Sequence, residues 1–150
     1  MKSYTDIEQS KELAKILPIE SADMHYNNAS IKGINYVDEY RAELMDYKTA
    51  QKVLSKYLVN PLFEIIPCWS LSALIQVLPI TIVDSWTDYC LMLDIKAKMP
   101  RYVKYGDVYH PEFPWDFKKQ SLLDSVVESI FWLHNNNFLN GSNRSNLFNL

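Results

Sequence analysis

The segment PCWSLSALIQVLP, residues 67–79, constrains the fold more than any other part of the chain. Ser70 is a favourable N-cap residue and Pro79 cannot continue a helix, so the segment predicts a helix over about 70–78. Within it only a serine and a glutamine are polar, which leaves apolar side chains on nearly every side. Such a helix has to be covered by other elements, and we expect it to be the central buried helix of the fold.

Several short stretches have the composition of β-strands. The runs LFEII (62–66) and ITIV (80–83) are rich in branched and aromatic residues and too short for helices, so each predicts a strand beside the apolar helix. Residues 89–98 alternate apolar and polar side chains, which indicates a half-buried strand. Pro100 permits a turn, and 101–105 can return as the hairpin partner.

Three further helices are predicted from periodicity and capping. One covers about 6–17 and is opened by a capping box in Thr5-Asp6-Ile7-Glu8. The second covers 38–58, where Tyr40, Leu58 and residues between them fall on one arc at 100° per residue. The last begins at Ser121 and continues to about His134.

The chain has 150 residues, of which 48% are hydrophobic, and this suffices for one domain with a real core. We therefore expect a single α+β domain over 1–150, with a small, mainly antiparallel sheet and helices packed on it. Residues 18–37 predict only one or two short strands, near 24–26 and 34–37. The tail over about 135–150 is rich in asparagine and is expected to fray.

Composition argues against several function classes. The formal charge is -3 and the chain has only 3 Gly, with no phosphate-cradling motif. No apolar run approaches the roughly 18 residues of a membrane span, and the N-terminus lacks the apolar core of a secretory signal. These features predict a cytoplasmic protein with no membrane partner. There is no Cys-x-x-Cys pair, which disfavours zinc. A single histidine with scattered carboxylates, His110 with Asp107, Glu112 and Asp116, is more typical of a solvated loop than of a metal site, so no metal is expected, and no cofactor either.

The order of three motifs carries a family resemblance. ILPIESADMHY is followed by IIPCWSLSALIQVLP, then by a strand pair and the closing helix LLDSVVESIFWLHNNNFL. This arrangement resembles short uncharacterised proteins of gut-bacterial genomes and their phages and mobile elements, most specifically at PCWSLSAL. The helix expected at 38–58 departs from their shorter pattern. No activity is known for such proteins, so the resemblance implies a small accessory protein and assigns no catalytic residue.

Cys68 is the candidate nucleophile of an enzymatic hypothesis. A cysteine at the start of a helix can have its thiolate stabilised by the helix dipole, and Cys-Trp occurs at the nucleophile of papain-like proteases. However, the protease signature requires a preceding glycine and a second cysteine, whereas Pro67 directly precedes Cys68 in this chain. A partner imidazole could come only from His25, His110 or His134. We favour a packed thiol, and rank a cysteine-dependent enzyme third among the possible functions.

Basic residues gather in two segments and favour a second hypothesis, nucleic-acid binding. One group is expected on the 38–58 helix and the other on the 96–104 hairpin, beside Tyr102 and Tyr105, which could stack on bases. The two groups are Arg41, Lys48, Lys52 and Lys56, and Lys96, Lys98, Arg101 and Lys104. The alternative is that both are ordinary solvated surfaces.

Protein interaction is the hypothesis that we favour. On the helical wheel Trp132 points away from the apolar arc of the last helix, and an outward tryptophan is a good anchor for a partner or for self-association. The proline-rich loop at 105–117 adds Tyr109, Phe113 and Trp115. These rings and Trp132 either cover one another or form an exposed apolar patch. The sequence thus predicts a non-catalytic accessory or interaction protein.

Overall fold

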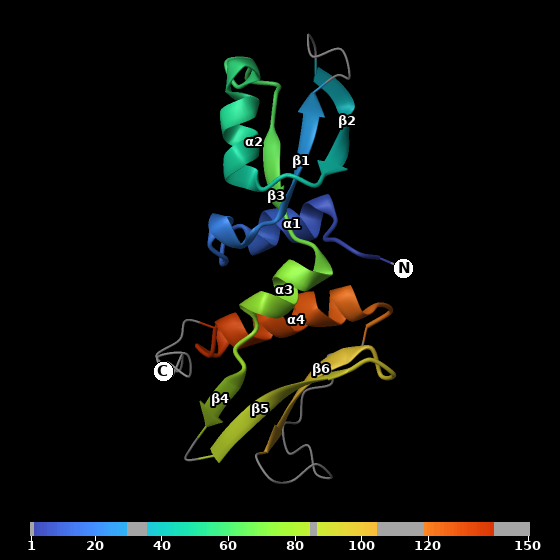
Figure 1. The fold of residues 1–150 in the computed structure, drawn as a ribbon, viewed down its shortest axis with the longest axis vertical. Coiled ribbons are helices and arrows are strands. Elements are labelled where there is room, and N and C mark those ends of the chain that lie inside the picture. Colours follow the sequence, from blue (N-terminus) through green and yellow to red (C-terminus); the bar gives the residue numbers. More distant parts are fainter. Residues whose placement is uncertain (1, 30–35, 85–86, 105–118, 140–150) are drawn as a thin grey trace. The chain divides into compact units, whose positions relative to one another are not determined.

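The computed structural model describes residues 2–29, 36–84, 87–104 and 119–139 (Figure 1). Within these residues the chain forms four α-helices and six strands, and the strands make two antiparallel three-stranded sheets. The predicted α+β class is confirmed, with two sheets in place of one. The chain separates into two compact units. We call Ser3–Leu74 the N-terminal unit, and Ile75–Leu150 together with Met1–Lys2 the C-terminal unit.

The sheet of the N-terminal unit has β1 (Met24–Ala29) at its centre. The strands β2 (Tyr36–Glu43) and β3 (Ile65–Cys68) pair with it on either side, both antiparallel. Met24 lies opposite Cys68, and Tyr26 lies opposite Ile66. Since side chains alternate along a strand, these four residues share one face of the sheet. The short strand expected near 24–26 is part of β1. Of the strand expected near 34–37, Tyr36 and Val37 belong to β2, and 34–35 lie outside the described residues.

A helix covers each face of this sheet. Ile7 of α1 (Ile7–Leu13) packs against the cluster of Met24, Tyr26, Ile66 and Cys68. On the opposite face, Ala50 of α2 (Tyr47–Val53) packs with Phe63 and Ile65. The short helix η1 (Ile19–Ser21) precedes β1. The N-terminal unit is therefore a sheet buried between two short helices.

The predicted helix over 38–58 is wrong in its first part. Residues up to Glu43 belong to β2, and α2 begins only after Asp46, whose carboxylate accepts a hydrogen bond from the amide of Thr49 at 2.9 Å. Tyr40 and Ala42 both pack partly against the core, at the two-residue spacing of a strand. The residues of the predicted helical arc therefore belong to three different elements: the strand β2, the helix α2 and the short helix η2 (Ser55–Tyr57).

The first helix was predicted in the right place but with the wrong cap and length. Asp6, not Thr5, is the N-cap: its carboxylate accepts from the amide of Gln9 at 2.9 Å, and the Gln9 side chain accepts from the amide of Asp6 at 3.2 Å. Thr5 is fully buried, and its hydroxyl accepts from the amide of Trp69 at 3.2 Å. The helix ends at Leu13, before the predicted limit.

The apolar helix α3 (Leu71–Val77) begins and ends as predicted. The hydroxyl of Ser70 accepts a hydrogen bond from the amide of Ala73 at 3.2 Å, and the carboxylate of Asp23 accepts one from the amide of Ser70 at 2.8 Å. Leu74 is fully buried. The boundary between the two units falls within α3, so only its first residues belong to the N-terminal unit.

The C-terminal unit contains the second sheet and the longest helix. Its strands run in the order β4 (Thr81–Asp84), β5 (Thr87–Asp94) and β6 (Met99–Lys104), as the predicted hairpin requires. The turn differs from prediction, because Pro100 lies within β6 and Ile95–Lys98 make the turn, with Lys98 at a φ of 57°. Asp94 supports this turn by accepting a hydrogen bond from the amide of Ala97 at 2.7 Å.

Helix α4 (Leu122–Asn135) forms the core of the C-terminal unit. The hydroxyl of Ser121 accepts from the amide of Asp124 at 3.1 Å, which confirms the predicted start. The helix contacts β6 and buries one apolar stripe, and the sheet contributes buried rings and an isoleucine. These residues are Leu123, Val126, Val127, Ile130 and Leu133 of α4, and Ile82, Tyr89 and Tyr102 of the sheet.

The end of α4 is held by a short return of the chain. The amide of Phe138 donates to the carbonyl of Leu133 at 2.8 Å, and the ring of Phe138 stacks on Trp132. The rest of the predicted frayed tail, 140–150, lies outside the described residues. Two compact units can belong to one domain, so the single domain over 1–150 stays a prediction.

Candidate interaction surface

Exposed apolar side chains concentrate in one short segment of the N-terminal unit. Eleven large apolar side chains are exposed among the described residues, and four of them lie within ten residues of sequence. They are Val53, Leu58, Val59 and Leu62, with exposed fractions of 55%, 43%, 87% and 55%. We call these four residues the apolar patch. Single exposed apolar residues are common on proteins, whereas a contiguous exposed apolar surface is typical of a site that binds a partner.

Local structure explains why these side chains face outward. Helix α2 ends at Val53, and the half-buried Leu54 and the buried Phe63 pack into the core cluster at either end of the connection to β3. Between them, the side chain of Asn60 accepts a hydrogen bond from the amide of Leu62 at 3.0 Å, which closes a tight turn. Because Leu54 and Phe63 already fill the core from this segment, the four patch residues remain on the surface.

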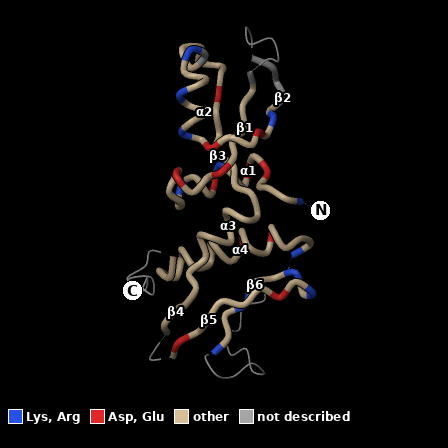
Figure 2. Tube along the Cα trace, viewed as in Figure 1, with Lys and Arg blue, Asp and Glu red and all other residues tan. Residues whose placement is uncertain are grey.

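The patch lies in a lysine-containing segment that Asp46 and Glu64 directly flank. Residues 47–63 contain three lysines and no aspartate or glutamate, in a chain whose formal charge is -3. Lys48 pairs with Glu20 at 2.7 Å, and this hydrogen bond and charge lower the pKa of the Glu20 carboxyl. Lys52 and Lys56 are both exposed. Figure 2 shows these cationic positions along α2 and the turn that follows it.

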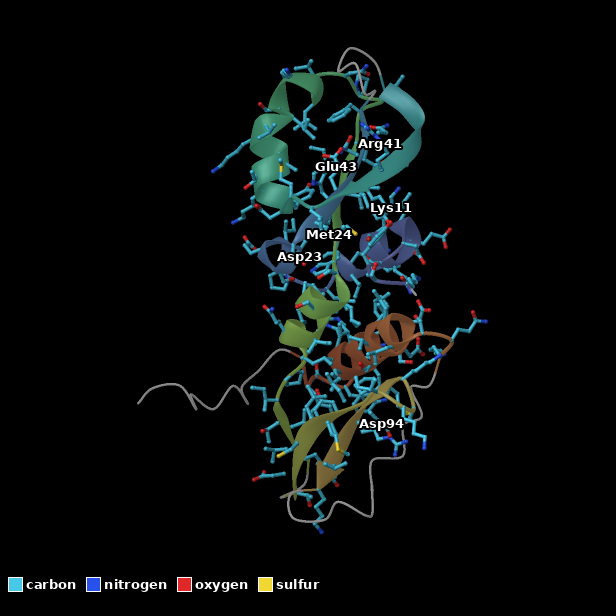
Figure 3. The ribbon with its side chains drawn as sticks, turned by 45° about the vertical axis from the view of Figure 1, so that its right-hand side comes forward. Lys11, Asp23, Met24, Arg41, Glu43 and Asp94 are labelled. Atoms are coloured by element: carbon cyan, nitrogen blue, oxygen red, sulfur yellow. The ribbon has the colours of Figure 1, made fainter. Side chains whose placement is uncertain are left out.

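The structure divides the first predicted basic group. Lys48, Lys52 and Lys56 lie on α2 and η2, whereas Arg41 lies on β2, two residues before Glu43 (Figure 3). Arg41 therefore does not belong to a helical stripe. Lys48 pairs with Glu20.

The second basic group belongs to the C-terminal unit. Lys96 and Lys98 are exposed in the β5–β6 turn, and Lys104 is exposed at the end of β6. Arg101 is half-buried and pairs with Asp94 at 3.4 Å. Tyr102, one of the two rings expected to stack on bases, is buried, and its hydroxyl donates to the carbonyl of Pro79 at 2.8 Å. Tyr105 lies outside the described residues.

Trp132, the anchor predicted from the sequence, is half-buried. Its ring stacks on Phe138 with 5.6 Å between ring centroids and an interplanar angle of 19°. One face of the indole is thus occupied by the same chain. Tyr109, Phe113 and Trp115 of the predicted loop at 105–117 lie outside the described residues. That Trp132 and these rings bind a partner stays a prediction.

Cys68 lies in a closed environment. It is fully buried, and its sulfur lies 3.6 Å from the hydroxyl and 3.7 Å from the carbonyl oxygen of Thr5. Burial raises the pKa of the Cys68 thiol, with smaller opposing effects from hydrogen bonds that include one to Thr5. A nucleophilic cysteine needs the opposite shift and access to substrate. The environment of Cys68 is that of a packed thiol.

The histidine nearest to Cys68 in the sheet faces away from it. Cys68 pairs with Met24, so the next residue, His25, projects from the opposite face. His25 is fully buried: Nδ1 lies 2.8 Å from the carbonyl oxygen of Met45, and Nε2 lies 3.1 Å from the side-chain nitrogen Nδ2 of Asn27. Both ring nitrogens therefore have partners, and His25 fixes the start of α2 against the sheet. His110 lies outside the described residues, and His134 belongs to α4.

In the described parts of the chain, no three or more histidine, cysteine, aspartate or glutamate side chains come together in a way that could hold a metal ion. No helix among the same residues is both long and apolar enough to cross a membrane.

No protein-family model, curated protein or solved structure matches this chain. The resemblance drawn from the three sequence motifs accordingly stays an expectation.

Sequence reasoning did not find the apolar patch. The predicted 38–58 helix placed Leu54 and Leu58 together on one buried arc, whereas Leu54 is half-buried and Leu58 is exposed. A signal was present in LVNPL, residues 58–62, where apolar residues flank an Asn-Pro turn that cannot be helical. Apolar residues at such a turn either fold onto the core or remain exposed, and the sequence alone does not separate these outcomes.

Proposed function

We propose that this chain is a non-catalytic interaction protein that binds a protein partner through the apolar patch on the N-terminal unit. The observation that carries the proposal is the exposure of Val53, Leu58, Val59 and Leu62 within one short segment. Leaving four aliphatic side chains in water forgoes the favourable transfer of their surface out of water. A partner that covers them recovers that free energy, and Leu54 and Phe63 of the same segment pack in the core cluster.

The chemistry of the remaining candidates supports a binding role over catalysis. The thiol of Cys68 is buried and its pKa is raised, and the fully buried His25 projects from the other face of the sheet. The buried hydroxyls of Thr5 and Ser10 lie 2.7 Å apart and bond to each other. Polar groups in this core are thus engaged in holding the fold together.

A paired substitution tests the proposal. We expect Val59→Ser combined with Leu62→Ser to abolish co-purification of specific partners from cells that produce the chain, measured by quantitative mass spectrometry. Because both side chains are exposed, the free energy of unfolding should change by no more than about 0.5 kcal/mol per site.

The matched control is Ile80→Ser combined with Ile95→Ser in the C-terminal unit, whose exposed fractions are 63% and 67%. This control removes as much exposed aliphatic surface and should leave the partners in place. The proposal is wrong if the two double variants retain the same partners to the same extent, since the patch would then differ in no way from other exposed apolar residues.

A further inference from the structure

We infer that His25, Asn27 and Glu43 form a pH-sensitive switch in the N-terminal unit, in which protonation of the imidazole moves Nε2 of His25 from the side chain of Asn27 to the carboxylate of Glu43. The inference does not depend on the apolar patch. It follows from the placement of one fully buried imidazole between a side-chain amide that donates to the neutral ring and a carboxylate that accepts from the charged ring.

The bond to Met45 fixes which nitrogen of the neutral ring carries the proton. Nδ1 of His25 lies 2.8 Å from the carbonyl oxygen of Met45, and a carbonyl oxygen only accepts hydrogen bonds. Nδ1 therefore donates, and Nε2 of the neutral ring keeps a lone pair. That lone pair accepts the bond from Nδ2 of Asn27 at 3.1 Å. The buried neutral imidazole thus has a partner at each nitrogen.

A second proton on the ring removes the bond to Asn27. When Nε2 also carries hydrogen, it faces the Asn27 side-chain amide as one donor facing another, and no hydrogen bond forms. The carboxylate of Glu43 can accept from Nε2 instead, because Oε2 of Glu43 lies 3.7 Å away. His25 and Glu43 are opposite each other in the β1–β2 pair. The Glu43 side chain is half-exposed, so it can turn toward the ring.

Strand β2 also places a positive charge on this face of the sheet. Arg41 lies opposite Asn27 in the register, two residues before Glu43 (Figure 3). Its guanidinium disfavours a second positive charge nearby, so a charged ring depends on the carboxylate of Glu43. From β3, Pro67 and Ile65 occupy the positions opposite β1, and neither side chain titrates.

The start of α2 packs over the same face, and its ionisable side chains have other contacts. The carboxylate of Asp46 caps the helix, and Lys48 pairs with Glu20 at 2.7 Å. The ring of Tyr47 packs partly against the core cluster of this face. Glu43 is therefore the counter-charge of the protonated imidazole.

The exchange changes which elements the ring connects. The neutral ring joins β1 to Met45, the residue before the N-cap of α2, and the charged ring adds a charge-assisted bond to the last residue of β2. Imidazole side chains typically change charge between about pH 5 and pH 8. Acidification through this range should draw Glu43 toward the ring and release the Asn27 amide. One buried side chain thus couples pH to the end of β2.

NMR spectroscopy of the full chain, labelled with 15N and 13C, tests the exchange. It reports the protonation of both ring nitrogens, the Asn27 side-chain amide and the Glu43 carboxyl carbon, and the His25 signals are those lost in His25→Gln. We expect a proton on Nδ1 alone at high pH and on both nitrogens at low pH. The signals of Asn27 and Glu43 should change over the same pH interval as those of the ring.

Matched substitutions separate the role of Glu43 from that of any exposed carboxylate. Glu43→Gln removes the charge, so at a fixed mildly acidic pH the ratio of charged to neutral His25 should fall at least about threefold. Asn27→Ala removes the competing donor and should raise this ratio. The control is Glu64→Gln, because the Glu64 side chain is also half-exposed and bonds to Tyr40. It should leave the ratio unchanged.

Several results would overturn the inference. A proton on Nε2 of His25 at high pH would reject the assigned tautomer and with it the switch. Asn27 and Glu43 signals that stay fixed while the ring becomes charged would reject the exchange, as would equal ratios in Glu43→Gln and Glu64→Gln. Loss of the circular dichroism of the folded chain before the ring becomes charged would show that the fold accepts only the neutral imidazole, which also contradicts the switch.

Discussion

The two units stabilise their small cores through different kinds of interaction. The N-terminal unit buries polar side chains, and these tie segments distant in sequence to one another: Thr5 bonds to Trp69, His25 to Met45, and Asn28 to Leu62 and Glu64. The C-terminal unit instead lays the apolar stripe of α4 against its sheet. Its buried serines bond within their own helix or to the residues just before it.

Because of this difference, different kinds of substitution should destabilise the two units. A core held by long-range bonds between side chains and backbone loses stability when a buried polar group is left without its partner. A core of packed aliphatic side chains loses stability when a cavity is made. The units therefore should respond in opposite order to polar and apolar truncations.

The largest expected effect is a cavity in the C-terminal unit. Ile130 is fully buried in the stripe of α4, so Ile130→Ala should lower the free energy of unfolding by about 2 to 5 kcal/mol. The measurement is urea unfolding followed by circular dichroism. Ile95→Ala, at an exposed position of the same unit, is the control and should change stability by less than about 0.5 kcal/mol. Equal effects of the two would mean that α4 does not form the core.

A polar truncation should distinguish the N-terminal unit. His25→Leu removes the partner of the Met45 carbonyl and one partner of Asn27, and should cost about 1 to 3 kcal/mol for the buried groups left unsatisfied. The counterpart is Ser129→Ala in α4, which removes a buried hydroxyl that bonds only to the Val126 carbonyl of its own helix. It should be nearly neutral. The comparison breaks if Ser129→Ala costs as much as His25→Leu.

Trp132 occupies an intermediate place, because it is half-buried and stacks on Phe138. Trp132→Ala should cost about 1 to 2 kcal/mol through the lost ring contact and lost burial. Phe138→Ala should reproduce part of this loss, and the double variant should be less destabilised than the sum of the two. Additive effects would show that the stacked pair contributes nothing.

Alkaline pH should weaken the N-terminal unit through Cys68. Burial raises the pKa of this thiol above its unfolded value of about 8.5. Between the two values the unfolded chain releases a proton that the folded chain keeps, so stability falls as pH rises above about 8.5, by at most about 1.4 kcal/mol per pH unit. Cys68→Ala should flatten this part of the stability curve. An unchanged slope in Cys68→Ala would contradict the assignment.

The two cysteines should also differ in the rate at which they react with a disulfide reagent in the native chain. Cys68 is fully buried in the N-terminal unit, and Cys90 is partly exposed on β5. A disulfide reagent should therefore label Cys90 of the native chain quickly, and Cys68 only at the rate of unfolding or local opening. Each thiol is measured alone in the Cys90→Ser or Cys68→Ser variant. Rapid native labelling of Cys68 would revive the nucleophile hypothesis.

The same difference explains how much of the fold was readable from sequence. In the C-terminal unit the start of α4 at Ser121 and the hairpin of β5 and β6 were predicted, because each depends on local periodicity and capping. In the N-terminal unit the region 38–58 was misassigned. Its strand is specified by pairing with β1 and its helix by the cap at Asp46, and neither signal outweighs an apparent helical arc.

The candidate site was predicted still less completely. Cys68 was expected to be packed, and it is fully buried. The exposure of the patch residues, in contrast, depends on which apolar side chains of this segment enter the core cluster. Leu54 and Phe63 enter the core cluster, and Val59 and Leu62, of equal hydrophobic character, do not. Such a choice is made by tertiary packing, which hydrophobicity along the chain does not encode.

The most direct test of the proposed function is a methyl NMR titration of the full chain, labelled at valine, leucine and isoleucine, with a partner recovered by co-purification. Binding through the apolar patch predicts shifts confined to Val53, Leu58, Val59 and Leu62 and their neighbours, with the exposed Ile80 and Ile95 unmoved. Shifts centred on the C-terminal unit, or no shifts of the patch residues at a saturating concentration of the partner, would contradict the proposal.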